Sequence, residues 1–116
     1  MSRITLSAHS LAPFFTALAD PTRLRLLHLM AGREVCVCYF AEALGESQPK
    51  ISRHLAYLRR MGIAAARREG KWAHYQIKFP AHAGAAAILR QTLVTLQKDP
   101  AMRMDLKRLR ESHCVK

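Results

Sequence analysis

The sequence predicts a mainly α-helical fold that carries a helix-turn-helix followed by a β-hairpin wing. Apolar residues recur at helical spacing through most of the chain, and a tight turn with a glycine separates a short helix from a longer one. A strand-forming segment with a basic turn follows directly. With 116 residues, the chain is long enough for one modest core, so we expect a single domain over 1–116 whose residues from about 101 onward form a basic C-terminal tail.

Two helices are expected in the N-terminal third of the chain. Ser10 is the expected N-cap of the first, because its hydroxyl can accept from a free backbone amide. The buried face of this helix should hold the apolar residues at helical spacing, which are Leu11, Phe14, Phe15 and Leu18. Asp20 followed by Pro21 is typical of a helix start, and the leucine-rich run up to Gly32 is apolar nearly all round. The second helix should therefore lie in the core.

The helix-turn-helix is expected after this core helix. Residues 37–44 predict a short helix that ends at Gly45. Ser47 can cap the next helix, and Pro49 is tolerated there because the amides of a first turn have no partner inside the helix. The longer helix carries an apolar stripe, formed by Ile51, Leu55 and Leu58. It should pack on the core by this stripe and leave its opposite face exposed.

A β-hairpin and a long helix complete the predicted fold. Residues 63–77 predict the hairpin, with a Glu-Gly-Lys turn between two strands, the first of which has weak strand propensity. Residues 80–97 predict a long helix with apolar side chains along one side. An Asp-Pro pair ends this helix, and the basic, amphipathic segment that follows is open to two interpretations, a further helix or a frayed tail.

The charge balance favours an acidic partner. The chain has 19 Lys and Arg against 8 Asp and Glu, which gives a formal net charge of +11. Such an excess favours a polyanion, because each phosphate that is neutralised releases counterions, and nucleic acid is the leading candidate. A soluble basic surface or a basic tail is the alternative on charge alone. No apolar run approaches the roughly 18 residues that cross a bilayer, and the N-terminus has no signal-peptide block. We therefore expect a cytoplasmic protein without a membrane partner, and the absence of catalytic motifs argues against an enzyme.

The exposed face of the longer helix is slim and cationic, which suits the major groove of DNA. Recognition helices contact bases mainly from their N-terminal half, where the expected readers are Gln48, Lys50, Ser52 and Arg53. Tyr57 flanks this face, and Arg60 is expected to hold a phosphate. Around the hairpin turn, phosphate or minor-groove contacts are expected from Arg67, Arg68 and Lys71. His54 lies beside the apolar stripe, where a packed role and a DNA contact both remain open.

Four segments within about residues 11–80 carry a family resemblance: ALADPTRLRLLHLM, EVCVC, SQPKISRHLAYLRRMGI and REGKWAHYQI. They resemble the ArsR/SmtB family of metal-sensing repressors, specifically its arsenic-responsive branch. The resemblance implies a winged helix-turn-helix homodimer, assembled through the first and last long helices, with SQPKISRHL as recognition helix. The family signature E-L-C-V-C-D-L-C appears here over 34–41 with two of its three cysteines, and Ala41 stands in place of the third. The last long helix lacks the Asp/His pattern of the related zinc and nickel sensors, which counts against those metals.

Cys36 and Cys38 form a C-x-C pair beside the predicted DNA-reading unit. In an extended chain residues i and i+2 point the same way, whereas in a helix they lie about 200° apart. Both thiolates can therefore hold one ion only where the backbone is extended or the start of the helix unwinds, so ligand capture should move the helix-turn-helix. Thiolates at a helix N-terminus suit a soft ion, and trivalent arsenic and antimony favour three sulfurs.

Cys114 is the candidate third ligand. It lies 17 residues beyond Gln97, which at up to about 3.3 Å per residue can reach the site in its own protomer or in the partner. A small thiol in place of Cys114, or an inert core role for the C-x-C pair, remain open as alternatives.

These observations predict an arsenite- or antimonite-responsive repressor, whose homodimer dissociates from operator DNA when As(III) or Sb(III) binds the cysteines. No organic cofactor is expected. Two alternatives remain open. One is a redox-sensing repressor of the same fold, in which a disulfide other than the strained i, i+2 pair forms. The other is an architectural protein that is held to DNA by charge and ignores metalloids.

Overall fold

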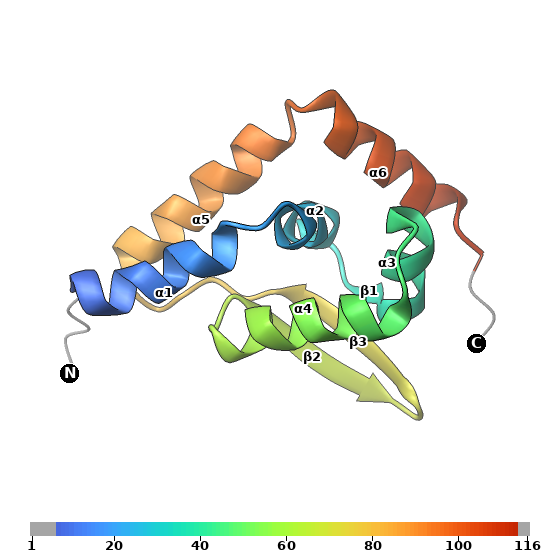
Figure 1. The fold of residues 1–116 in the computed structure, drawn as a ribbon, viewed down its shortest axis with the longest axis horizontal. Helices are drawn as coiled ribbons and strands as arrows, with labels where there is room; N and C mark the ends of the chain where they lie inside the picture. The colour runs from blue at the N-terminus through green and yellow to red at the C-terminus, as the bar shows by residue number, and fades with distance from the viewer. Residues whose placement is uncertain (1–6, 114–116) are drawn as a thin grey trace.

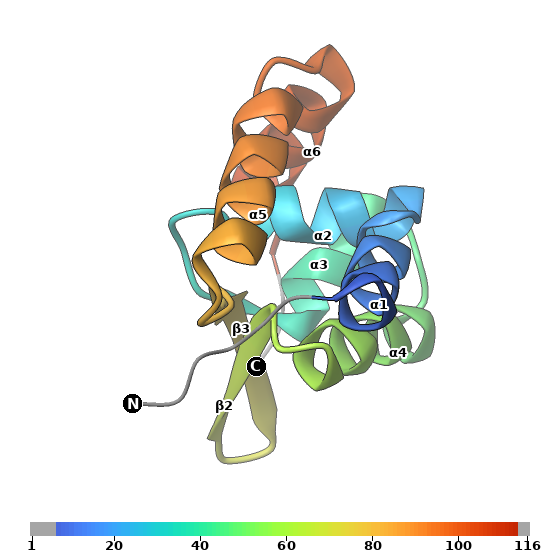
Figure 2. The ribbon, with the colours of Figure 1, turned by 90° about the vertical axis from the view of Figure 1, so that its left-hand side faces the viewer.

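The computed structural model describes residues 7–113, which form six helices and a three-stranded sheet (Figure 1). In chain order the elements are α1 (Ala8–Leu18), α2 (Pro21–Met30), β1 (Val35–Cys36), α3 (Val37–Leu44), α4 (Gln48–Arg60), β2 (Ala64–Glu69), β3 (Trp72–Ile77), α5 (Ala83–Leu96) and α6 (Pro100–Glu111). In Figure 1, α5 and α6 form the two arms of an inverted V above α2. Figure 2 shows α4 and the β2–β3 hairpin on the other side of α2, with the hairpin projecting away from the helices. The predicted winged helix-turn-helix is confirmed.

The N-terminal helix α1 corrects two expectations. Its N-cap is Ser7 rather than Ser10, because the two serines form a reciprocal capping box one turn earlier. Phe15 was expected in the buried face, but 46% of it is exposed. Successive helical residues lie about 100° apart, so Phe14, which is buried in the core, turns its neighbour away from it.

The core is built around α2, as predicted. The Asp20 carboxylate caps this helix by accepting from the backbone N–H of Arg23 at 3.0 Å, and Pro21 occupies the first turn. Side chains on several sides of the helix are fully buried, among them Leu26, Leu27 and Leu29. Four helices, namely α1, α4, α5 and α6, therefore pack on α2.

The helix-turn-helix follows the predicted boundaries. α3 ends at Gly45, whose φ of +65° is a left-handed conformation that glycine adopts without strain. The Ser47 hydroxyl accepts from the backbone N–H of Lys50 at 3.3 Å, and Pro49 lies in the first turn of α4. The predicted stripe is fully buried at Ile51, Leu55 and Leu58. One face of α4 is thus fixed to the core, and the opposite face lies at the surface.

The sheet contains one strand more than the sequence predicted. β2 and β3 form the wing, and β1 pairs with the other edge of β3, giving the antiparallel order β1-β3-β2. In this register Val35 lies opposite Tyr75 and Cys36 lies opposite His74. A strand of two residues is too short to show alternation, so only its pairing with β3 defines it. The extra strand connects the thiol segment directly to the wing.

The long helix α5 begins at Ala83 rather than at 80. His82 caps it, because its Nδ1 accepts from the backbone N–H of Gly84 at 3.0 Å. Leu89 and Leu93 bury one side of the helix. No helix within 7–113 combines the length and the apolar character that a bilayer crossing requires.

The basic segment after α5 forms a helix, α6, capped by Asp99. This helix packs on α2 and α3. Asp105 is only 2% exposed, and both of its oxygens accept from the Arg25 guanidinium of α2, at 2.8 and 2.9 Å. A bidentate ion pair therefore fixes the last helix to the centre of the fold.

Candidate functional site

The outer face of α4 carries most of the predicted DNA-reading residues. Four are exposed, namely Gln48, Ser52, Arg53 and Arg60, and two are half-buried, namely Lys50 and Tyr57. Lys50 forms an ion pair with Glu46 at 3.1 Å. The Tyr57 ring lies between two guanidinium groups, with Arg23 at 4.6 Å and Arg60 at 5.6 Å from its centroid. The structure thus brings these predicted residues onto one polar and cationic helix face.

His54 lies behind this face and contacts Arg23. The His54 Nδ1 is 3.4 Å from the Arg23 guanidinium, which also donates to the backbone carbonyls of Thr16 and Ala17 at 2.9 Å each. Arg23 therefore connects α2, the end of α1 and α4. This contact favours the packed role for His54 over a DNA contact.

The basic residues of the wing fall into two groups. Arg68 and Lys71 are exposed, and within the described part of the chain neither meets a carboxylate. Arg67 instead donates through Nε to both carboxylate oxygens of Glu34 at 3.2 Å, and through Nη1 to Glu69 at 3.3 Å. These hydrogen bonds raise the pKa of Arg67 and hold the pKa of the Glu34 carboxyl below its ordinary value. Arg67 is therefore engaged within the protein, unlike its neighbour Arg68.

The C-x-C pair lies where β1 becomes α3. Cys36 is the last residue of β1 and the N-cap of α3, with an extended backbone at φ −75° and ψ 144°, and Cys38 lies in the first turn. Both side chains are buried, and their sulfur atoms are 3.8 Å apart. Two sulfurs that share one ion, with bonds of about 2.3 Å each, lie at most about 4.6 Å apart. In its reduced form the pair therefore fits a common ion, and the extended backbone at Cys36 makes this possible without unwinding α3.

The described residues supply no third ligand beside the two cysteines. Among residues 7–113, no group of three or more His, Cys, Asp or Glu side chains is placed to hold a metal ion. Cys114 lies outside the described residues. The residue that precedes it, His113, donates its backbone N–H to the Glu42 carboxylate of α3 at 3.3 Å. The described chain thus ends in contact with the helix that carries Cys38.

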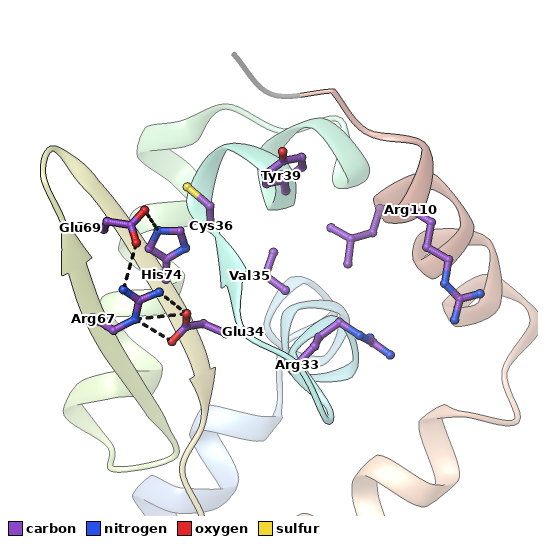
Figure 3. Close-up of a pocket in the computed structure, with 10 residues that line it drawn as sticks. Arg33, Glu34, Val35, Cys36, Tyr39, Arg67, Glu69, His74 and Arg110 are labelled. Atoms are coloured by element: carbon purple, nitrogen blue, oxygen red, sulfur yellow. Dashed lines mark hydrogen bonds and ion pairs between the residues drawn. The ribbon is translucent and has the colours of Figure 1, made fainter. Parts of the chain in front are cut away.

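A pocket of about 530 Å³ opens beside Cys36, between the sheet, α3 and the end of α6 (Figure 3). Its lining residues are Arg33, Glu34, Val35, Cys36, Tyr39, Arg67, Glu69, His74, Leu109 and Arg110. Figure 3 shows Glu34, Arg67, Glu69 and His74 joined by a chain of hydrogen bonds and ion pairs below Cys36. The thiol site therefore borders the charged inner face of the wing.

Sequence reasoning missed three members of this cluster: Glu34, Glu69 and His74. His74 is 7% exposed, and its Nε2 is 3.8 Å from the Glu69 carboxylate. Glu34 lies two residues before Cys36, so an extended segment places both on one side of the chain. The two-residue spacing of Glu34 and Cys36 could have indicated that both side chains lie on one side of the chain. It points to the wing only because β1 pairs with β3.

Known proteins match this chain in sequence and in structure. The family described as "Bacterial regulatory protein, arsR family" matches residues 20–66. The arsenical resistance operon repressor of Escherichia coli K12 is 49% identical over 76 residues, which are 65% of this chain and 65% of that protein. The arsenic resistance transcriptional regulator ArsR2 of Pseudomonas putida KT2440 is 40% identical over 107 residues, 86% of this chain and 93% of that protein. Among solved structures, the AntR antimony-specific transcriptional repressor has a TM-score of 0.62 and 28% identity, covering 84% of this chain and 89% of that chain.

These matches cover the elements that matter for the site. Residues 20–66 run from the cap of α2 through the C-x-C pair and the helix-turn-helix into β2. The chain spans slightly less than two thirds of the Escherichia coli repressor but nearly all of ArsR2. These relatives are transcriptional regulators and not enzymes, as the sequence predicted. The chain therefore belongs to the arsR family of bacterial regulatory proteins.

Proposed function

We propose that this protein is a cytoplasmic transcriptional repressor that binds operator DNA as a homodimer and releases it when As(III) or Sb(III) binds its cysteines. The observation that carries the proposal is the 3.8 Å separation of the Cys36 and Cys38 sulfurs at the start of α3. Because α3 is the first helix of the helix-turn-helix, the ligand site and the DNA-reading unit share one element.

DNA binding is supported by the charge and by the outer face of α4. In a two-fold symmetric dimer, two α4 helices enter successive major grooves, about 34 Å apart along the DNA. Gln48, Ser52 and Arg53 are exposed in the N-terminal half of α4, where base edges are read. The exposed Arg68 and Lys71 of the wing hold phosphates beside them.

Exposed apolar surface supports the homodimer. Phe15 of α1 and Val94 of α5 are 46% and 41% exposed, which leaves apolar side chains of both long helices uncovered in a single chain. A groove of about 430 Å³ between α2 and α5 is lined by Leu24, Ile88, Gln91, Thr92, Thr95 and Leu96. A second copy that covers these helices excludes this surface from water.

The donor atoms favour a soft, thiophilic ligand. Thiolates select soft ions, and the trivalent metalloids accept three sulfurs. Cys36 and Cys38 supply two, and Cys114, which directly follows a residue held against α3, supplies the third. The ligands in the names of two similar proteins, an arsenical repressor and an antimony-specific repressor, agree with this choice.

The site requires a smaller movement than an unwound helix. Because Cys36 is already extended, the ion bridges the junction of β1 and α3 as it stands, and recruitment of the third sulfur pulls on that junction. A coupling of about 1–3 kcal/mol between ligand and DNA changes operator affinity by about 5- to 150-fold. A displacement of α3 and β1 of modest size is therefore sufficient.

The test is operator binding by the reduced protein with and without arsenite or antimonite. Fluorescence anisotropy on a duplex from the region upstream of its own gene compares the wild type with Cys36→Ser, Cys38→Ser and Cys114→Ser. We expect all four proteins to bind the duplex and only the wild type to release it when metalloid is added. A Cys114→Ser variant that responds fully reduces the protein site to the C-x-C pair, completed by a small thiol.

Two further arms separate the alternatives. Release by hydrogen peroxide that dithiothreitol reverses, together with no release by metalloid, identifies a redox sensor and contradicts the proposal. Affinity that ignores metalloid and differs little between the upstream duplex and a scrambled duplex identifies an architectural protein.

A further inference from the structure

The sheet places the thiol site and the wing in one cross-strand row. Cys36 of β1 lies opposite His74 of β3, and His74 lies opposite Arg67 of β2. Residues in register across adjacent strands project from the same face of a sheet, and here that face lines the pocket beside Cys36. A shift of Cys36 therefore acts on the row that ends at Arg67.

A second connection runs beside this row. Glu34, two residues before Cys36, accepts from Arg67 across 33 residues of sequence, with both carboxylate oxygens 3.2 Å from Nε. Arg67 also donates to Glu69 on its own strand, and the Glu69 carboxylate lies 3.8 Å from His74. Figure 3 shows the planar Arg67 guanidinium between the Glu34 and Glu69 carboxylates, where it connects the thiol segment to the wing.

We propose that Arg67 is a coupling residue rather than a DNA contact: through Glu34 it transmits the displacement of the metalloid-loaded thiol segment to the wing. This inference rests on the proposed function. It reassigns Arg67 from the phosphate contact that the sequence predicted, because its guanidinium is already engaged by two carboxylates. Arg68, the next residue on the same strand, points to the opposite face and keeps the phosphate role.

The first experiment compares Arg67→Gln with the matched control Arg68→Gln. Operator affinity is measured across a series of salt concentrations, with and without arsenite. A lost phosphate contact lowers the slope of log affinity against log salt by about 1. We expect Arg68→Gln to lose about one unit of slope and keep the full arsenite response. Arg67→Gln should keep the wild-type slope, while its arsenite-induced loss of affinity shrinks to about a third of that of the wild type or less.

A charge exchange tests the ion pair itself. Glu34→Arg combined with Arg67→Glu restores an opposite-charge pair at the same two positions, whereas each single change places like charges together. We expect the arsenite response to fall in both single variants and to recover in the double variant. Arg67→Lys should respond weakly, because an ammonium keeps the charge but not the bidentate fork.

Arsenite affinity, measured with and without operator DNA, distinguishes a coupling role of Arg67 from a purely structural one. Linkage requires that operator DNA weakens arsenite affinity by the same factor by which arsenite weakens operator affinity. In Arg67→Gln, arsenite affinity of the free protein should therefore match the wild type, and the penalty imposed by DNA should shrink. A wild-type response and a lowered salt slope in Arg67→Gln overturn the inference and restore the phosphate contact. A wild type that ignores metalloid altogether overturns the proposed function instead.

Discussion

The two charged faces of the molecule are built differently. On the outer face of α4, Arg53 and Arg59 are exposed, and within the described residues neither meets a carboxylate. In the pocket beside Cys36, Arg67 is held by Glu34 and Glu69. The apolar face of α4 comes from one continuous segment of the chain. By contrast, ion pairs between residues far apart in sequence join the strands beside the pocket and connect α6 to α2. A net charge of +11 therefore does not distinguish exposed cations such as Arg53 from cations that are held by carboxylates, such as Arg67; the ion pairs of each cation do.

The largest expected effect tests whether α4 depends on its apolar face. Leu55→Ala removes a fully buried side chain and leaves a cavity, so the free energy of unfolding should fall by about 2–5 kcal/mol. Urea unfolding followed by circular dichroism, at fixed protein concentration, measures this change. The exposed control Arg59→Ala on the same helix should stay within about 0.5 kcal/mol of the wild type. Equal losses in the two variants would contradict the assignment of the buried face.

The second test concerns the ion pair that holds α6. Asp105→Asn removes the charge that accepts two hydrogen bonds from Arg25, and unfolding should become easier by about 2 kcal/mol. Glu111→Gln makes the same chemical change on the exposed side of the same helix and should be nearly neutral. The urea midpoints of both variants, compared with that of the wild type, measure these changes in stability. If Asp105→Asn unfolds at the wild-type midpoint, α6 does not depend on this pair.

The third test separates base reading from phosphate binding on α4. Arg53→Ala should weaken operator binding by about 1–3 kcal/mol and relax sequence preference, because Arg53 lies in the N-terminal half of α4, the half from which recognition helices contact bases. Arg59→Ala should weaken binding to operator and scrambled duplexes alike and lower the salt slope by about 1. Anisotropy titrations on both duplexes distinguish the two outcomes. A uniform loss in Arg53→Ala would place Arg53 on the phosphates.

The same contrast explains what the sequence could predict. The ends of α2, α3 and α4 are set by local residues such as Asp20, Gly45 and Ser47, so their pattern was readable without the fold. The C-x-C pair was equally visible, and its extended start was one of two predicted alternatives. The two-residue strand β1 carries too little pattern to be found alone.

Long-range contacts set the remaining features. Nothing near Arg67 in the sequence indicates that it meets Glu34, 33 residues away, and nothing near Asp105 indicates that it meets Arg25, 80 residues away. The exposure of Phe15 also depends on the rest of the fold, because only the packing of α1 decides whether Phe14 or Phe15 faces the core. The residues around the pocket therefore could not be predicted without the fold, whereas the helix-turn-helix could be predicted from its local sequence pattern.

The smallest expected effect is a pH dependence at the packing of α6 on α2. His28 is 4% exposed, and burial, the largest cause, lowers its pKa. The backbone of Met102 opposes this shift, Arg33 adds repulsion, and the Asp105 and Asp99 carboxylates act in the opposite direction. Below about pH 6.5, the ordinary value, the unfolded chain therefore binds a proton at His28 that the folded chain resists. Stability is lost as the pH falls through this window and down to the lowered pKa.

His28→Gln should remove this part of the pH dependence, because glutamine stays neutral throughout. Urea midpoints between pH 7.5 and 5 compare it with the wild type and with His9→Gln, which changes an exposed histidine. We expect the control to follow the wild type and His28→Gln to lose less stability on acidification. Parallel curves for all three proteins would mean that α6 stays packed on α2 when His28 is protonated, with the ion pair from Arg25 to Asp105 still in place.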